Sequence, residues 1–302
     1  MTVGFIPVVY NVVEKRLFMK NSSVPTEAVA IYNHALELSN KGDMIKALKE
    51  YHKAIDLHPS FVEAYNNIGE IYSQMGNRKE AISTYMEALK IGKNYRILLN
   101  LGVEHYNSKN FEIALNFFRE SLNEKIDFLE GHFYAAMVYY NMKKFKEAEH
   151  HFRSVIAIDS KHLKAHYMLS YIYYEWKQYN KVIEVLESIR DIADDKAFFN
   201  KYYGFCSYYM GNYKVAIEYL TSALELQPKY KKFKGYLKNL SVEKKVKEIG
   251  DVDNAIKNLE KQMIEDSPSF REISELSMLY IFKGRNQEAE KLLLEARNRM
   301  AS

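Results

Sequence analysis

Three asparagines stand at almost equal spacing in the first third of the chain and carry the same chemistry. They are Asn33, Asn67 and Asn100. A carboxamide group offers a hydrogen-bond donor and an acceptor on one side chain, so it can bond to both polar groups of a peptide unit. A row of such groups could therefore hold an extended polypeptide without reading its side chains.

Four tyrosines recur further along the chain at one constant interval. They are Tyr106, Tyr140, Tyr174 and Tyr208. If such a row is partly exposed, it suits an apolar helix or an extended segment of a partner, because aromatic side chains are common interface anchors. The alternative is that the rings only fill space between helices. Both interpretations stay open at the level of the sequence.

The chain lacks the sequence motifs of catalysis. No phosphate-binding loop, dinucleotide fingerprint or serine-nucleophile motif occurs. His162 and His166 lie one helical turn apart, but no HExxH motif or fixed acidic partner accompanies them. Cys206 is the only cysteine, which excludes an internal disulfide framework and a cysteine-based zinc cluster. We therefore expect no enzyme, no cofactor and no metal site.

Both rows are part of a longer repeat, so the elements that position them must repeat as well. A small residue returns about once every 34 residues, with one longer interval before Ala255, at Ala47, Ala81, Ala114, Ala148, Val182, Ala216, Ala255 and Ala289. Within each interval, apolar residues at helical spacing form two patterns separated by a glycine or polar turn. Only 12 glycines and 5 prolines are present, which also favours helices. The sequence predicts an all-α chain of helix-turn-helix units.

This pattern resembles the tetratricopeptide repeat family. The resemblance is carried by the period of about 34 residues, by the small–aromatic–small spacing of AISTYMEA and by the unit-ending prolines Pro59 and Pro228, and it spans residues 28–302. It implies a right-handed superhelical solenoid of about eight units. The first helix of each unit would line a concave groove that binds a protein or peptide.

The resemblance also implies which residues line that groove. In the family, an asparagine at the place of Asn67 can hold the backbone of a ligand, although asparagine is also simply common there. Arg96 joins Asn67 and Asn100 in a partial match to the family's carboxylate-clamp variety, from which Tyr32 and Leu36 depart. The candidate peptide-binding residues are Asn33, Asn67, Asn100, Arg96, Tyr106, Phe133, Tyr140, Tyr167, Tyr171, Tyr174 and Tyr208.

The longer interval, between Ala216 and Ala255, interrupts the repeat. It predicts an N-terminal extension (1–27), units one to six (28–230), an insertion (231–235) and units seven and eight (236–302). Residues 229–247 hold eight lysines and one glutamate, a local charge of +7 in a chain of net charge +4. This segment is either a solvated helix face or a basic patch for an acidic partner, formed by Lys229, Lys231, Lys232, Lys234 and Lys238. It lacks arginine, and no nucleic-acid motif accompanies it, so specific nucleic-acid binding is not expected.

The expected location is the cytoplasm. No run approaches the ~20 apolar residues of a membrane-spanning helix, and no basic region precedes the apolar N-terminal residues as it would in a signal peptide. The apolar residues Leu292, Leu293 and Leu294 near the end of the chain favour self-association or a partner.

We therefore predict a non-enzymatic scaffold or adaptor of bacterial origin that binds a protein or peptide partner in its concave groove. The second hypothesis is a structural subunit of a larger bacterial assembly, such as motility, secretion or envelope machinery. Such a subunit would dock through its ends and its convex face, and this hypothesis rests on analogy between folds.

Overall fold

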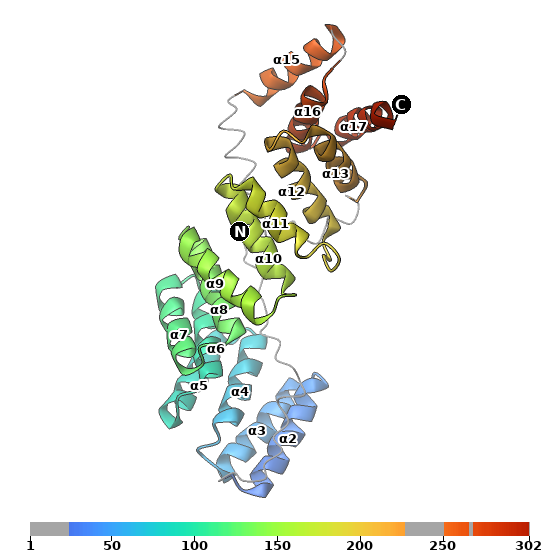
Figure 1. Cartoon of the computed structure of the whole chain (residues 1–302). Coiled ribbons are helices and arrows are strands. Elements are labelled where there is room, and N and C mark those ends of the chain that lie inside the picture. Colours follow the sequence, from blue (N-terminus) through green and yellow to red (C-terminus); the bar gives the residue numbers. More distant parts are fainter. Residues whose placement is uncertain (1–23, 227–250, 266–267, 302) are drawn as a thin grey trace. The chain divides into compact units, whose positions relative to one another are not determined.

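The computed structural model describes residues 24–226, 251–265 and 268–301, and these residues form fifteen helices and no strand (Figure 1). The prediction of an all-α helical repeat solenoid is confirmed. Residues 1–23, the insertion at 231–235 and the basic patch lie outside the described residues. Contacts divide the chain into two compact units, one ending at Ile158 and the other beginning at Asp159. Each unit is described by itself.

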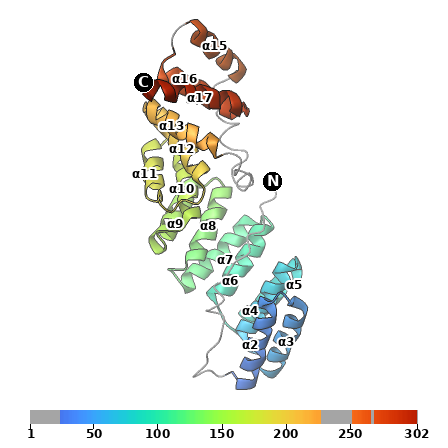
Figure 2. The same cartoon turned by 90° about the vertical axis from the view of Figure 1, so that its right-hand side faces the viewer.

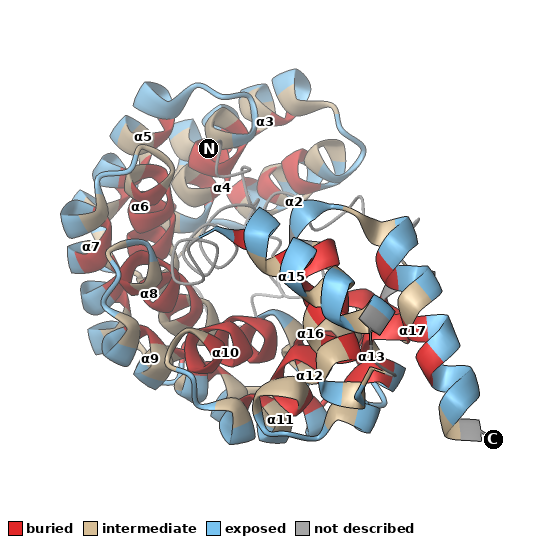
Figure 3. Ribbon diagram, turned by 90° about the horizontal axis from the view of Figure 1, so that it is seen from above, coloured by how far each residue is buried: buried red, intermediate tan, exposed pale blue. Residues whose placement is uncertain are grey.

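The N-terminal unit consists of four antiparallel helix pairs. In order, the pairs are α2 (Thr26–Asn40) with α3 (Met44–Leu57), α4 (Val62–Gln74) with α5 (Arg78–Ile91), α6 (Tyr95–Asn107) with α7 (Phe111–Glu124), and α8 (Leu129–Asn141) with α9 (Phe145–Ile158). The first helix of every pair lies on one side of the unit and the second helix on the other (Figure 3). We call the side formed by first helices the first-helix face.

The C-terminal unit continues this pattern and then changes. Its helices are α10 (Leu163–Glu175), α11 (Tyr179–Glu187), α12 (Lys196–Tyr209), α13 (Tyr213–Glu225), α15 (Val252–Glu265), α16 (Phe270–Lys283) and α17 (Asn286–Ala301). The pairs are α10 with α11, α12 with α13, and α16 with α17.

Several pairs are held together by a close approach between a small residue on the first helix and a large side chain on the second, which is a ring in α5 and α7 and Leu220 in α13. A Cβ atom added to Gly69 would lie 2.4 Å from a ring carbon of Tyr85, and one added to Gly102 would lie 2.4 Å from a ring carbon of Phe118. The rings of Tyr85 and Phe118 are buried. The small residues of the repeat are therefore required by the distance between the two helices of a pair.

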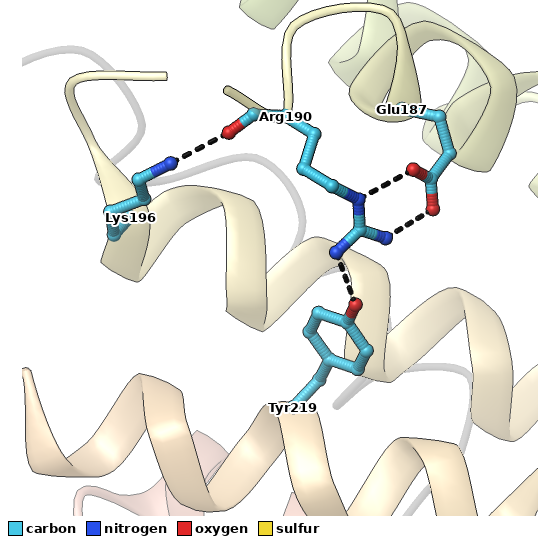
Figure 4. A network of polar contacts seen from close by, with 4 residues as sticks. All are labelled: Glu187, Arg190, Lys196 and Tyr219. Carbon is cyan, nitrogen blue, oxygen red and sulfur yellow. Dashed lines mark hydrogen bonds and ion pairs between the residues drawn. The ribbon is translucent and has the colours of Figure 1, made fainter. Parts of the chain in front are cut away.

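The second helix of the fifth repeat unit is shorter than its counterparts, and an arginine lies just after its end. α11 has 9 residues, whereas α13 has 13. Arg190, just after α11, donates a hydrogen bond of 2.7 Å from Nε to Glu187 and one of 2.8 Å from Nη1 to the hydroxyl of Tyr219 (Figure 4). Its guanidinium also lies 5.4 Å from the ring centres of both Phe199 and Tyr203. Arg190 thus ties the irregular connection to α12 and α13.

The order of helices in space differs from their order in the chain after α13. α16 and α17 pack directly against α13, and α15 packs against α16 on the side away from α13 (Figures 1 and 2). Ser274 of α16 donates a hydrogen bond of 3.4 Å to the backbone oxygen of Tyr213. On the other side of α16, Tyr280 donates one of 2.7 Å to Glu260 of α15. In space the pair of α16 and α17 therefore follows α13 directly, although α15 comes before this pair in the chain.

The turn inside each pair needs one residue in the left-handed conformation. Gly42, Gly76, Gly211 and Gly284 have φ values of 85°, 79°, 82° and 75° at this place. In the three units between Gly76 and Gly211 the same place holds a lysine, with φ values of 62°, 60° and 59° at Lys109, Lys143 and Lys177. A side chain in this conformation costs roughly 1–2 kcal/mol, which glycine avoids.

Two histidines of the N-terminal unit meet where α8 packs on α9. The Nδ1 atoms of His132 and His151 are 3.0 Å apart, and the ring of Tyr139 stacks on His151 with centres 5.5 Å apart. Burial lowers the pKa of His151 to about 4, and the nearby positive charges of His132, His150 and Arg119 act in the same direction. His151 is therefore neutral in the folded protein at neutral pH.

We predict that Lys143→Gly stabilises the protein by about 0.5–1 kcal/mol, because the relief of the left-handed conformation exceeds the added freedom of the unfolded chain. The urea midpoint of the full chain measures this change. The matched control is Lys146→Gly, an exposed position within α9, which should cost about 1 kcal/mol. Equal losses of stability in both variants would contradict the prediction.

The histidine pair predicts a loss of stability in mild acid. The pKa of His151 is about 4 when folded and near 6.5 in its ordinary state, so below pH 6.5 the unfolded chain binds a proton that the folded chain does not. The free energy of unfolding should fall by roughly 2 kcal/mol between pH 6.5 and pH 4 through this residue.

His151→Phe keeps an aromatic ring against Tyr139 and removes the titrating group. Urea unfolding of both proteins from pH 4 to pH 8 should show a shallower acid slope in the variant and a constant difference above pH 7. Parallel curves throughout this range would show that His151 does not cause the acid sensitivity.

Candidate peptide-binding surface

All predicted binding residues lie on first helices. Those of the N-terminal unit are Asn33 on α2, Asn67 on α4, Arg96, Asn100 and Tyr106 on α6, and Phe133 and Tyr140 on α8; those of the C-terminal unit are Tyr167, Tyr171 and Tyr174 on α10, and Tyr208 on α12. The first-helix face is therefore the surface on which these residues are compared.

Asn67 takes part in the internal packing of the N-terminal unit. It is 5% exposed, and its Nδ2 donates hydrogen bonds of 2.8 Å to the hydroxyl of Tyr32 and 3.0 Å to that of Tyr51. Burial raises the pKa of both tyrosines, so both remain protonated. The two amide hydrogens of Asn67 are thus already used within the fold, and its side chain connects α4 to the first helix pair.

A chain of side-chain hydrogen bonds joins α4 to α6. Asn100 is 4% exposed and donates from Nδ2 to Oδ1 of Asn66 over 3.0 Å. Asn66 in turn donates to Glu70 over 2.8 Å. Sequence analysis missed Asn66, although it directly precedes Asn67. Asn33 differs from both, because its buried Oδ1 accepts no hydrogen bond from the described residues.

A second polar group on α6 was also missed from the sequence. The carboxylate of Glu104, which is 2% exposed, accepts a hydrogen bond of 3.1 Å from Nε of Arg78 and another from the hydroxyl of Ser73. A buried carboxylate needs such partners, because an unpaired charge would cost several kcal/mol. Glu104 therefore links α6 to α5 and α4.

The aromatic candidates of the N-terminal unit pack mainly against other side chains. The hydroxyl of Tyr106 accepts a hydrogen bond of 3.1 Å from Asn141, and Phe133 meets Phe152 edge-on with centres 6.0 Å apart. Both candidates are buried, whereas Tyr140 is half-buried and packs on Phe145 at 5.6 Å.

In the C-terminal unit the aromatic candidates form a cluster between α10 and α12. Tyr174 lies 5.1 Å from Tyr202, and Tyr167 lies 4.8 Å from Phe198 (ring centres). Tyr171 completes the cluster, 6.4 Å from Tyr202. Burial raises the pKa of Tyr174 well above its ordinary value. These rings stabilise the packing of two first helices.

Lys201 of α12 lies beside this cluster and was missed from the sequence. Its Nζ is 5.6 Å from the ring centre of Phe205 and 5.7 Å from that of Tyr202. Burial lowers the pKa of Lys201 to about 8. The side chain is half-buried, so it combines a positive charge with apolar surroundings on the first-helix face. Such a position suits a carboxylate on an otherwise apolar partner.

Four of the predicted residues keep part of their surface exposed, namely Asn33, Arg96, Tyr140 and Tyr208. The guanidinium of Arg96 lies 5.6 Å from the ring centre of Tyr95, and Tyr208 lies 5.7 Å from Tyr213. The structure thus separates the candidates into buried residues that pack within the fold and half-buried residues that keep some exposed surface.

The histidines do not form a metal site with other ligands in the described part of the chain. His162 accepts from the backbone nitrogen of Ala165 at the start of α10, and Nδ1 of His166 lies 3.1 Å from the backbone oxygen of His162. Within residues 24–226, 251–265 and 268–301, no three histidine, cysteine or acidic side chains are grouped to hold a metal ion. None of the helices described has both the length and the apolar character needed to cross a membrane.

Two family models match parts of the chain. One described as a TPR repeat matches residues 40–76, and one described as a tetratricopeptide repeat matches residues 62–94, 130–162 and 203–230. The matched stretches fall on helix pairs of both units.

Curated relatives match short stretches of the chain. It is 33% identical over 63 residues to the uncharacterized protein MJ0572 of Methanocaldococcus jannaschii, which is 21% of this chain and 73% of that protein. It is 38% identical over 58 residues to the photosystem I assembly protein Ycf3 of Acaryochloris marina, which is 19% of this chain and 35% of that protein. A match to the probable peptide N-acetylglucosaminyltransferase SPINDLY of Hordeum vulgare, 26% identical over 109 residues, covers 33% of this chain and 12% of that protein. The chain thus spans only a minor part of Ycf3 and SPINDLY.

Solved structures share the fold over a larger part of the chain. Pseudomonas aeruginosa PilF superposes with a TM-score of 0.60 at 18% identity, covering 69% of this chain and 94% of PilF. PilW, a type IV pilus biogenesis factor, superposes with a TM-score of 0.56 at 16% identity, covering 69% of this chain and 96% of PilW. These likenesses show a fold of stacked helical repeats. On its repeat matches and on this shared architecture, the chain belongs to the tetratricopeptide repeat family.

Proposed function

We propose that the chain is a non-enzymatic adaptor that binds a protein or peptide partner along its first-helix face. The observation that supports the proposal is that each candidate residue lies on the first helix of its pair. A preordered surface of this kind binds with little loss of conformational entropy.

The chemistry of the first-helix face suggests what kind of partner would bind. On α12 of the C-terminal unit, the half-buried ring of Tyr208 suits an apolar anchor of the partner, and the half-buried charge of Lys201 suits a carboxylate. The partner would therefore be an apolar segment that carries an acidic residue. The cytoplasmic location and the bacterial origin stay predictions from the sequence.

The proposed function predicts that partner binding depends on the half-buried residues of the first-helix face. A partner identified by crosslinking and mass spectrometry in the source cells should bind the full chain in a titration. Arg96→Ala and Tyr140→Ala should each weaken this binding by roughly fivefold or more, the effect of losing about 1 kcal/mol at an interface.

Matched controls come from second helices of the same unit. Arg153→Ala removes an exposed arginine from α9, and Phe117→Ala removes a half-buried ring from α7. These two variants should bind as the unaltered chain does. If they weaken binding as much as the first-helix variants, the partner docks elsewhere, and the alternative of a structural subunit docked through its convex face gains support. Concentration-dependent assembly in sedimentation would also favour that alternative.

A further inference from the structure

Two imidazole rings of the fourth helix pair face each other through the same nitrogen atom. His132 lies near the start of α8, and His151 lies on α9. Their Nδ1 atoms are 3.0 Å apart, and the planes of the two rings are inclined by 44°. Both side chains are half-buried, and neither belongs to the candidate peptide-binding residues. The pair is therefore a group of metal-binding side chains outside the surface described above.

The backbone determines which nitrogen of His132 carries hydrogen. Its Nε2 lies 2.9 Å from the backbone oxygen of Ile126, and a carbonyl oxygen only accepts hydrogen bonds. In the neutral ring the hydrogen is therefore on Nε2, and the lone pair of Nδ1 points toward His151. Histidines that bind metal ions are oriented in this way, with the second ring nitrogen donating to a backbone oxygen or a carboxylate.

His151 can supply a second lone pair at the same place. In the hydrogen bond between the two rings, Nδ1 of His151 donates to Nδ1 of His132. The Nε2 atom of His151 makes no hydrogen bond with a residue that the structure describes, so the ring can carry its hydrogen there instead. The hydrogen then moves from one nitrogen of His151 to the other, no proton is released, and both Nδ1 lone pairs face one point.

We propose that His132 and His151 form a binding site for Cu²⁺, with both Nδ1 atoms as ligands and water at the remaining positions. Metal–nitrogen bonds are about 2.0–2.1 Å long, so two ligands at right angles lie about 2.9 Å apart and two tetrahedral ligands about 3.4 Å apart. The distance of 3.0 Å fits neighbouring positions of a tetragonal ion. Cu²⁺ and Ni²⁺ prefer this geometry, and Cu²⁺ binds more tightly to a given set of nitrogen ligands.

The surroundings of the pair disfavour other cations. Both ligands are uncharged nitrogens, whereas Mg²⁺ and Ca²⁺ need several oxygen ligands. The positive charge of Arg119 acts on His151 and opposes any bound cation. Arg119 is held there because it donates a hydrogen bond of 2.9 Å to Tyr139, whose ring stacks on His151. The affinity must therefore come from the two metal–nitrogen bonds, which are strongest for Cu²⁺.

The site has two protein ligands, which agrees with the finding that the described residues contain no group of three possible ligands. Motifs within one helix do not reveal it, because its histidines are 19 residues apart on two helices. His162 and His166 are also close together, but both use Nδ1 for contacts with the backbone. Their Nδ1 lone pairs are therefore not arranged for shared binding.

This inference goes beyond the proposed function and does not depend on it. A bound ion would join α8 to α9 and, through Ile126, to the turn before α8. The tests below use no protein partner, so their failure is distinct from a failure of partner binding.

The first test titrates Cu²⁺ into the untagged full chain and records electron paramagnetic resonance spectra. One tightly bound Cu²⁺ per chain, with splitting from nitrogen ligands, is expected. His132→Gln and His151→Phe should each weaken binding at least about tenfold, since even the loss of a group that only supports a ligand has this effect. The matched control is His52→Ala, which removes an exposed histidine from α3 and should leave binding unchanged. Unchanged binding in the first two variants, or equal weakening in the control, would overturn the proposal.

A second test needs no variant and therefore does not depend on the stability of one. The unaltered chain with one equivalent of Cu²⁺ is treated with ascorbate in air, so that the bound copper oxidises the side chains that hold it. Mass spectrometry should locate oxidised histidine mainly at His132 and His151. All nine histidines of the chain lie among the described residues and serve as internal references. Oxidation spread evenly over them would mean adventitious binding only and would overturn the proposal.

Discussion

The structure depends on the distance between the two helices of each pair. At Gly69 and Gly102 the first helix approaches the ring of the second so closely that an added Cβ atom would overlap with it. Dense packing of this kind is sensitive to single methyl groups, so the small residue and the large side chain opposite it recur together. Because this contact recurs from pair to pair, the same helix of each pair comes to lie on the same side.

Side chains on the first helices hold neighbouring first helices together. Asn67 and Asn100 hold neighbouring first helices together through hydrogen bonds, and the rings of α10 and α12 do so through aromatic contacts. A surface built in this way is rigid before any partner arrives. Rigidity lowers the entropic cost of binding, which is why residues that never touch a ligand can still matter for its affinity.

In the C-terminal unit the order of the helices in space differs from their order in the chain. α16 and α17 pack on α13, although α15 precedes them in the chain. Each helix pair presents an apolar surface to the next pair, and any pair with a matching surface can bury it. The contacts of Tyr280 and Lys283 with α15 hold that helix on the other side of α16.

The sequence by itself determined the fold class and the alternation of helices and turns. A period of about 34 residues and a helical apolar spacing are local properties, and they specify these features without long-range information. The exposure of each candidate was decided only by the tertiary structure, because Asn67 meets Tyr32 and Tyr51 from other helices and Glu104 meets Arg78. The spatial order of α15, α16 and α17 was likewise beyond the sequence. Repeats with equivalent faces have similar packing energies, so contacts far apart in the chain select the arrangement.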